Sequence, residues 1–375
     1  MRQAIRAGSL GLVAAVLLAS GCGASGARDA PPSGERIVFL GDSITDGHTL
    51  PLLVIQALRD AGLPPPVCVN AGIGGDTAAG MRRRVDRDVL VHRPTRVALS
   101  VGVNDALRGV TQEAYEADVG AIAERLRAAR VPMLILTTSI LGPTHAEADR
   151  RLEGYNTFLR RLARERGYPV AEVNGLMRKV QADGANVFEA DEVHLNQEGY
   201  RVMARAVLDA LGRPAVAVPQ VLKVEVMPGL VRRWKVRAVG GPLDAAAVAA
   251  LRPDDPAWKD YALPEAQPQA HWWMDQERQR GFATALQEAA GPGGTYVGLA
   301  TVESKAARRV YLNPGAELRA IWLNGNRIYT VEGKEWRGWH AGRDRVAADL
   351  AAGPNTVVIE TGPHFFLSVT DDDTW

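Results

Sequence analysis

Short apolar runs alternate with longer amphipathic stretches along the first half of the chain. The apolar runs are nearly continuous, which is typical of strands buried on both faces, and they span residues 36–40, 66–70, 96–101, 132–138 and 168–173. Elsewhere apolar residues recur three and four positions apart among charged ones, which predicts helices over 50–62, 111–130, 147–167 and 196–212. Strands alternating with helices in this way predict a parallel sheet covered by helices.

The pattern changes beyond residue 220. Here the apolar runs are short and alternating, Trp, Gly and Pro are frequent, and long amphipathic helices are missing. Short strands at close spacing favour an antiparallel sandwich. We therefore predict two folded units, an α/β domain over 35–213 and an all-β accessory domain over 220–375, as a chain of 375 residues allows.

The amino terminus has the pattern of a targeting segment. Arginines at positions 2 and 6 precede an apolar run of residues 10–19, too short to span a bilayer comfortably, and "ASGC" follows at 19–22. This ending resembles a bacterial lipobox, although Ala19 stands where leucine is usual. We expect a signal peptide over 1–22, a lipid on Cys22 and a flexible Gly, Ala, Ser and Pro-rich tether over 23–34. The protein would then be exported and membrane-anchored, with plain secretion as the alternative.

Composition and charge exclude some partners. The chain is 46% hydrophobic and 23% charged, with a formal net charge of +1, so it offers nucleic acid no overall attraction. The arginine-rich stretch "MRRRVDRD" at 81–88 is interpreted as a solvated helix face. His, Cys and carboxylate residues form no cluster at metal-ligand spacing, so neither a metal nor a cofactor is expected. Nothing in the sequence predicts the oligomeric state.

Candidate chemistry begins at Ser43, which lies in "FLGDSITD" just beyond the first predicted strand. In a doubly wound sheet ligands bind beyond the carboxyl ends of the strands. Taken alone, a serine in "GDS" is more typical of a turn or a helix cap. Three further polar blocks change that balance, "NAGIGGDT" at 70–77, "VGVND" at 101–105 and "ADEVHLN" at 190–196.

These four blocks, in this order, resemble those of the GDSL, or SGNH, hydrolase family over about residues 36–211. The resemblance implies a flavodoxin-like three-layer α/β/α fold and a serine hydrolase. It implies a catalytic triad of Ser43, Asp191 and His194. It also implies an oxyanion hole formed by the backbone of Ser43 and Gly75 and the side chain of Asn104.

The chemistry accounts for these residue types. A serine hydroxyl needs a base within hydrogen-bond reach, and a carboxylate can fix the tautomer of that base. The oxyanion needs donors aimed at it. No G-x-S-x-G elbow surrounds Ser43, which argues against the α/β-hydrolase fold, and "GIGGDT" lacks the last glycine of a dinucleotide loop. We interpret Asp42, Asp46 and Asp76 as residues that brace loops.

The second unit carries two further motifs, "W-x-N-G" at 322–325 and "L-x-x-G-x-N" at 350–355. They resemble those of galactose-binding-like jelly-roll domains, many of which bind sugars. Asn-Gly also suits a tight hairpin turn, so the first motif is above all a fold signal. The candidate sugar contacts are aromatic side chains that would serve equally well in a core: Trp272, Trp273, Trp336 and Trp339.

Together these features predict an extracytoplasmic serine esterase that removes short acyl groups, most simply acetyl, from a carbohydrate. A sugar-binding module linked to a catalytic unit would raise the effective substrate concentration. Hydrolysis of lysophospholipids or of general carboxylic esters is the alternative substrate class. The alternative from another class is a non-catalytic, lipid-anchored carbohydrate-binding protein.

Overall fold

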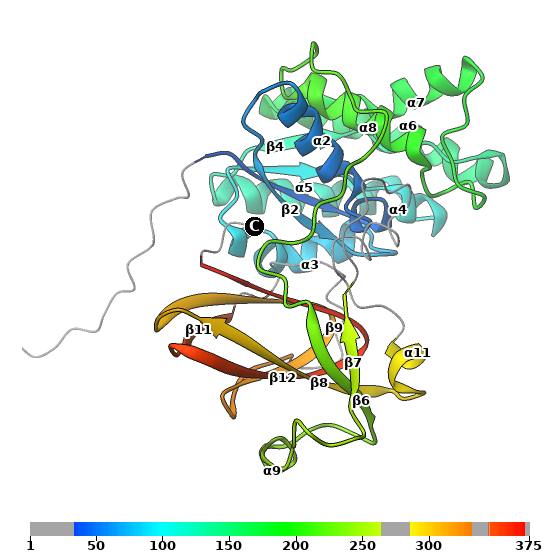
Figure 1. The fold of residues 1–375 in the computed structure, drawn as a ribbon. Helices are drawn as coiled ribbons and strands as arrows, with labels where there is room; N and C mark the ends of the chain where they lie inside the picture. The colour runs from blue at the N-terminus through cyan, green and yellow to red at the C-terminus, as the bar shows by residue number, and fades with distance from the viewer. Residues whose placement is uncertain (1–33, 264–285, 332–343, 345, 372–375) are drawn as a thin grey trace, which may run out of the picture. The chain divides into compact units, whose positions relative to one another are not determined.

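The computed structural model describes residues 34–263, 286–331, 344 and 346–371 (Figure 1). Within this part of the chain no helix is both long and apolar enough to cross a membrane. Cys22 and all four tryptophans named above as candidate sugar contacts lie outside the described residues.

A five-stranded parallel sheet forms the centre of the first domain. Its strands are β1 (Arg36–Gly41), β2 (Val67–Gly72), β3 (Arg96–Leu99), β4 (Met133–Leu136) and β5 (Val170–Ala171), in the order β2-β1-β3-β4-β5. Every residue of β1 and β4 is buried, as their continuous apolar sequences require. The predicted parallel sheet is confirmed. Its order reverses beside β1, the position where such sheets place their ligands.

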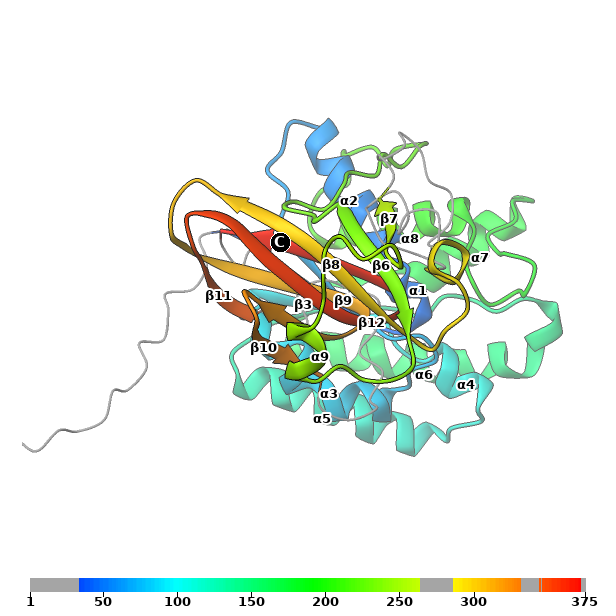
Figure 2. The same cartoon turned by 60° about the horizontal axis from the view of Figure 1, so that its bottom comes forward.

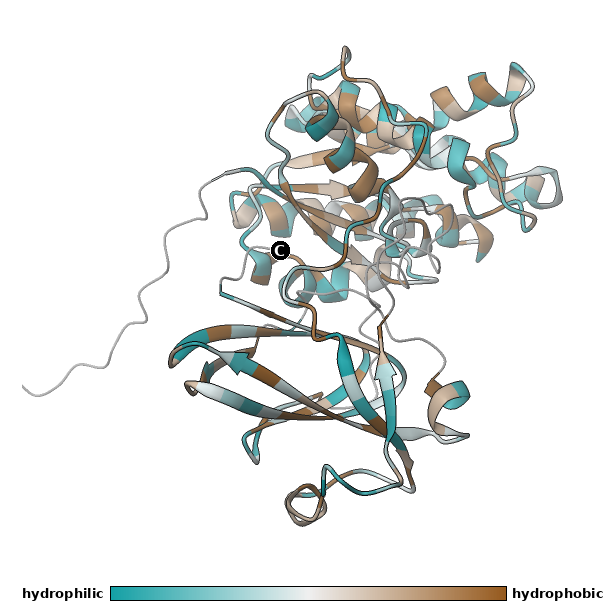
Figure 3. Cartoon of the chain, in the orientation of Figure 1, coloured by the Kyte–Doolittle hydropathy of each residue, from teal (hydrophilic) through white to brown (hydrophobic). Residues whose placement is uncertain are grey.

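Helices cover this sheet in two layers. They are α1 (Ser43–Asp46), α2 (Thr49–Asp60), α3 (Ala78–Asp88), α4 (Val103–Leu107), α5 (Gln112–Ala128), α6 (Ala146–Arg166), α7 (Val173–Ala182) and α8 (Gln197–Ala210), with short 3-10 turns at Leu90–His92 and Pro143–His145. α2 packs against α8 and α8 against α7, whereas α5 packs against α3 and α6. Apolar and polar bands alternate along these helices (Figure 3), because one side of each faces the core.

Local sequence sets where the long helices begin. The Thr111 hydroxyl accepts a hydrogen bond from Ala114 N, and Asn196 Oδ1 accepts one from Gly199 N, so both residues act as N-caps. The structure confirms the predicted helices α2, α5, α6 and α8. It adds α1, α4 and α7, and it shows that the helical segment expected over 81–88 belongs to the longer helix α3.

The carboxyl-terminal domain is antiparallel throughout its described strands. These are β6 (Arg233–Val239), β7 (Lys259–Ala262), β8 (Thr295–Ser304), β9 (Arg308–Leu323), β10 (Asn326–Thr330), β11 (Val346–Leu350) and β12 (Gly353–Thr370), with short helices α9 (Ala245–Ala249) and α11 (Leu286–Ala290). The predicted all-β domain is confirmed. The described strands form one sheet in the order β10-β9-β12-β8-β6-β7, with β11 paired to β9. The long strands β9 and β12 pair along both of their halves and run side by side (Figure 2).

The two motifs of this domain meet in space. Asn324 and Gly325 form the turn between β9 and β10 with φ values of 50° and 83°, the left-handed conformation that Asn-Gly hairpins adopt. Asn324 Nδ2 donates to Asn355 Oδ1 at 2.9 Å, and Thr356 N donates to Asn324 Oδ1 at 2.9 Å. The motifs therefore fix the hairpin to the start of β12, and Trp322 is buried in the core with 2% of its surface exposed.

Candidate active site

Ser43 is the first residue of α1, and a single residue, Asp42, separates it from the end of β1. Asp42 caps this helix, because its Oδ1 accepts a hydrogen bond from Ile44 N at 3.0 Å. The turn is tight: a Cβ added to Gly41 would lie 2.0 Å from Thr45 Oγ1. Only glycine allows α1 to pack this closely against the end of β1. The end of the buried strand therefore fixes the position of Ser43.

Asp191 and His194 come from the loop that precedes α8. Asp191 Oδ1 accepts hydrogen bonds from the backbone N–H groups of Val193 and His194, at 3.0 and 2.9 Å. His194 Nδ1 lies 2.5 Å from Asp191 Oδ2, and His194 Nε2 lies 2.8 Å from Ser43 Oγ. The fold therefore brings together three residues that lie in two distant parts of the sequence.

The charge on Asp191 determines the proton arrangement of this contact. Burial opposes ionisation of Asp191, but hydrogen bonds from the His194 ring and from the two backbone N–H groups outweigh it and lower the pKa to about 2. Asp191 is therefore a carboxylate at neutral pH and accepts a hydrogen bond from the protonated Nδ1 of His194. That tautomer leaves the lone pair of His194 Nε2 facing the Ser43 hydroxyl.

Gly75 lies in the turn after β2, the strand that pairs with β1. Asp76 N donates to Ile73 O at 3.1 Å, and Gly75 has a φ of +75°, as the third residue of a type II turn requires. Asp46 Oδ2 accepts from Gly74 N at 2.9 Å, which ties this turn to α1. The bracing role predicted for Asp46 agrees with this contact.

Asn104 lies on the short helix α4, directly after β3. Its Nδ2 donates to Asp42 Oδ2 at 3.3 Å, so the amide is held beside the Ser43 turn. The next residue, Asp105, accepts a hydrogen bond from Ala78 N with both carboxylate oxygens, at 3.1 and 3.2 Å. This contact fixes the Asn104 helix against the start of α3, close in sequence to Gly75.

Two carboxyl groups here have raised pKa values. Burial raises the pKa of Asp42 to about 7, although the Ile44 N–H and the nearby His194 lower it. Burial likewise raises the pKa of Asp105 to about 6, against the hydrogen bond from Ala78 N. Both groups therefore lie close to a change of charge at neutral pH.

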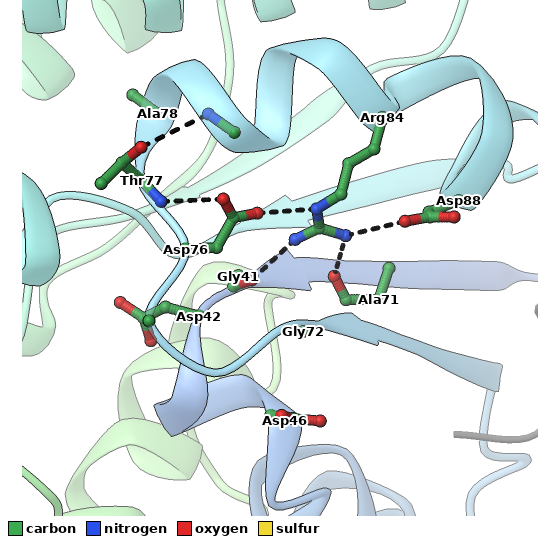
Figure 4. Close-up of polar contacts among 12 residues, drawn as sticks. Gly41, Asp42, Asp46, Ala71, Gly72, Asp76, Thr77, Ala78, Arg84 and Asp88 are labelled. Atoms are coloured by element: carbon green, nitrogen blue, oxygen red, sulfur yellow. Dashed lines mark hydrogen bonds and ion pairs between the residues drawn. The ribbon is translucent and has the colours of Figure 1, made fainter. Parts of the chain in front are cut away.

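The interpretation of residues 81–88 as a solvated face is wrong for Arg84, whose side chain is only 5% exposed. Figure 4 shows its polar contacts. Arg84 Nε donates to Asp76 Oδ2 at 2.7 Å, and the guanidinium also donates to Gly41 O at 2.9 Å and Ala71 O at 2.7 Å. Asp88 lies 3.4 Å away on the next helical turn. Burial is tolerated because carboxylates and carbonyls satisfy the planar donor fork.

Arg84 anchors the ends of the two strands that lead to Ser43 and Gly75. Gly41 is the last residue of β1, and Ala71 pairs with Leu40 across the β1–β2 ladder. Asp76, bound to the same guanidinium, follows Gly75 directly. The sequence carried one signal for this arrangement that went unused, the spacing of Asp76, Arg84 and Asp88 at helical intervals.

Across the described ranges, no group of three or more His, Cys, Asp and Glu residues is placed to hold a metal ion.

Residues 39–202 match the model of the GDSL-like Lipase/Acylhydrolase family. This segment is a GDSL-like lipase/acylhydrolase domain. The domain is that of a serine hydrolase acting on carboxylic esters, as the sequence blocks predicted.

Curated proteins similar to this domain include esterases. The chain is 29% identical over 177 residues to Esterase TesA of Pseudomonas aeruginosa, covering 45% of this chain and 87% of the relative. It is 25% identical over 215 residues to an acetylxylan esterase of Geobacillus stearothermophilus, covering 48% and 95%. It is also 27% identical over 139 residues to thioesterase 1/protease 1/lysophospholipase L1 of Escherichia coli K12, covering 36% and 65%.

Proposed function

We propose that this esterase uses Ser43 as nucleophile, His194 as general base and Asp191 as the carboxylate that orients His194. The observation that carries the proposal is the 2.8 Å contact between Ser43 Oγ and His194 Nε2, with Asp191 bound to the far side of the same ring. A serine hydroxyl becomes an effective nucleophile when a base at this distance takes its proton.

Each step then has an assigned group. Ser43 Oγ attacks the ester carbonyl while its proton moves to His194 Nε2, and Asp191 stabilises the imidazolium. When the tetrahedral intermediate collapses, His194 gives that proton to the departing alcohol. Water then attacks the acyl-enzyme, His194 takes the proton of the water, and the carboxylic acid leaves as Ser43 regains its hydrogen.

The oxyanion is stabilised by the backbone N–H groups of Ser43 and Gly75 and the Asn104 amide. The Asn104 amide has two donors, and only one is needed for its contact with Asp42. The second is available to a negative oxygen. The turns of Gly75 and Ser43 are fixed by buried contacts, so these donors are held in place before substrate binds.

Incubation with p-nitrophenyl acetate tests the assignment. Ser43→Ala should lose turnover while its thermal unfolding temperature stays near that of the parent, because the substitution removes one oxygen from the site. Turnover by Ser43→Ala at the parent rate would exclude this mechanism. It would also revive the alternative of a non-catalytic carbohydrate-binding protein.

The substrate proposed is a saccharide bearing short acyl groups, most simply acetyl. It is supported by the relative named acetylxylan esterase and by the resemblance of the carboxyl-terminal motifs to sugar-binding domains. The relative named lysophospholipase favours a second candidate, a lysophospholipid.

A chain-length series of nitrophenyl esters, followed by acetate release from acetylated xylan, pectin and peptidoglycan fragments, separates the two. The saccharide proposal expects highest turnover on acetyl esters and acetate from at least one glycan. Preference for acyl chains of eight carbons or more, with no acetate released, would contradict it and favour the lipid.

Export and anchoring through Cys22 complete the proposal, on the basis of the apolar run that ends in "ASGC". Expressed in a bacterial host, the protein should fractionate with membranes, and Cys22→Ser should release it. Continued membrane association of that variant would argue against lipidation.

A further inference from the structure

The loop that carries Asp191 and His194 is bound to residues 142–145, which follow β4. Gly142 N donates to Glu192 O at 2.9 Å. Thr144 donates to Glu192 Oε2 twice, from its backbone N at 2.8 Å and from its hydroxyl at 2.6 Å. His145 Nε2 lies 3.2 Å from the carbonyl oxygen of Asp191. Glu192 and residues 142–145 are called the brace below.

Glu192 has an unusual backbone conformation. Its φ is +58°, in the left-handed region that costs a non-glycine residue roughly 1–2 kcal/mol. This conformation turns the chain between Asp191 and His194, and Glu192 N donates to Glu189 O at 3.1 Å within the turn. A glycine would adopt the same backbone without strain. The side chain of Glu192 must therefore make interactions that compensate for the strain. The two hydrogen bonds that it accepts from Thr144 are such interactions.

Residues 142–145 and Glu192 are also closely packed against each other. A Cβ added to Gly142 would lie 2.5 Å from Glu192 Cβ and 2.7 Å from Glu192 Oε2. Gly142 has a φ of −75°, which any residue can adopt, so glycine is required here for the approach of Glu192 and not for the backbone. The hydrogen bonds from Thr144 also lower the pKa of Glu192, first through its hydroxyl and then through its N–H.

The catalytic loop is only partly buried, so contacts with a neighbouring segment contribute to holding it in place. The side chains of Asp191 and His194 are 49% and 37% exposed. Small displacements matter at this site, since a misplacement of about 1 Å can reduce a rate by roughly 100-fold. The loop must therefore be held from outside.

We propose that Glu192 is a positioning residue of the esterase, through which residues 142–145 keep His194 in line with Ser43. This proposal rests on the proposed function of Ser43 and His194. It assigns to Glu192 no contact with substrate.

The test measures turnover per active site. Sites are first counted by reaction of Ser43 with a fluorophosphonate, and p-nitrophenyl acetate turnover is then divided by that count. Glu192→Gly removes the carboxylate but keeps the left-handed turn, and it should lower kcat per titrated site roughly 10–100-fold with KM changed less than about twofold. Glu192→Gln, which keeps a neutral acceptor oxygen, should fall between this variant and the parent.

Substitutions on the other side of the contact provide the controls. Thr144→Val should lose part of the rate, and Thr144→Ser, which keeps the hydroxyl, should restore it. Thr157→Val, at an exposed threonine of α6, should match the parent. The double variant Glu192→Gly/Thr144→Val should be no worse than Glu192→Gly alone, because both changes break one interaction.

The outcomes separate this proposal from the function on which it rests. If Ser43→Ala is inactive but Glu192→Gly turns over at the parent rate per titrated site, the brace proposal is wrong and the mechanism stands. If Glu192→Gly lowers only the number of titrated sites, its role is in folding and the positioning proposal is overturned. If Ser43→Ala is active, the proposed mechanism itself fails.

Discussion

The two halves of the candidate active site are held in opposite ways. The turns of Ser43 and Gly75 follow buried strands, and the guanidinium of Arg84 binds the carbonyl oxygens at the ends of these strands and the Asp76 carboxylate (Figure 4). The loop of Asp191 and His194 is only partly buried and is held by hydrogen bonds to residues 142–145. The nucleophile side is anchored in the core, whereas the base side is attached at the surface.

Substitutions on the two sides should therefore differ in whether they affect folding or rate. Removing one partner of a buried ion pair leaves an uncompensated charge in the interior, which is strongly destabilising. Removing one partner of an exposed contact leaves a group that water can solvate, so stability changes little. Substitutions in the buried Arg84 network should therefore destabilise the folded domain. Substitutions around His194 should instead lower the rate of ester hydrolysis.

The largest effect is expected for Arg84→Met. It leaves Asp76 without its guanidinium partner in the interior, so the free energy of unfolding should fall by about 3–5 kcal/mol. Urea denaturation measures this, with Arg83→Met on the exposed face of the same helix as the matched control, expected within about 0.5 kcal/mol of the parent. Equal stability of the two variants would contradict the anchoring role.

Asn104→Ala should act on rate although it lies on the anchored side. It removes one oxyanion donor, and comparable deletions in other hydrolases reduce kcat by roughly 10²–10³. Steady-state kinetics on p-nitrophenyl acetate should show this loss with KM little changed. A kcat within threefold of the parent would remove Asn104 from the oxyanion hole.

Asp42 should make stability depend on pH. Its folded-state pKa of about 7 exceeds the ordinary 3.8, so between these values the folded state holds a proton that the unfolded state has released. Asp42 therefore contributes its full stabilisation below about pH 4, and this contribution is lost as pH rises toward 7. The free energy of unfolding falls by at most about 1.4 kcal/mol per pH unit on this account. Asp42→Asn keeps a capping side chain and should remove that slope from urea denaturation at pH 5, 6 and 7. An unchanged slope would exclude the titration of Asp42.

The smallest effect is expected at an exposed ion pair of the same domain. Arg160 and Glu172 are joined at 2.7 Å on the surface, with 39% and 48% of their side chains exposed. Glu172→Gln should change the free energy of unfolding by less than about 1 kcal/mol. A loss as large as that of Arg84→Met would erase the distinction between buried and exposed pairs.

Much of the fold could be predicted because the hydrophobic pattern follows burial directly. β1 and β4 are continuous apolar runs, and α5, α6 and α8 carry regular amphipathic spacing. The sequence predicts the α3 segment only as a solvated helix face, because its inward face includes Arg84, which a hydropathy pattern counts as solvent-facing. Burial of that residue depends on Gly41 and Ala71, two carbonyls from other strands.

The site shows the same division. Ser43, Gly75, Asn104, Asp191 and His194 lie in recognisable sequence blocks, and the structure places Ser43, His194 and Asp191 in contact. Thr144 and Glu192 carry no local signal, because their contact joins loops 48 positions apart. Side chains that hold a site from a neighbouring loop become visible only when the chain has folded.

The assignment of Ser43 as the nucleophile is tested by the mass of the protein after reaction with a fluorophosphonate, followed by peptide mapping. One adduct is predicted, on the peptide that contains Ser43, absent from Ser43→Ala and formed much more slowly by His194→Ala, whose serine has lost its base. Labelling of Ser43→Ala to the parent extent, or an adduct on another residue, would contradict the assignment of Ser43 as the nucleophile.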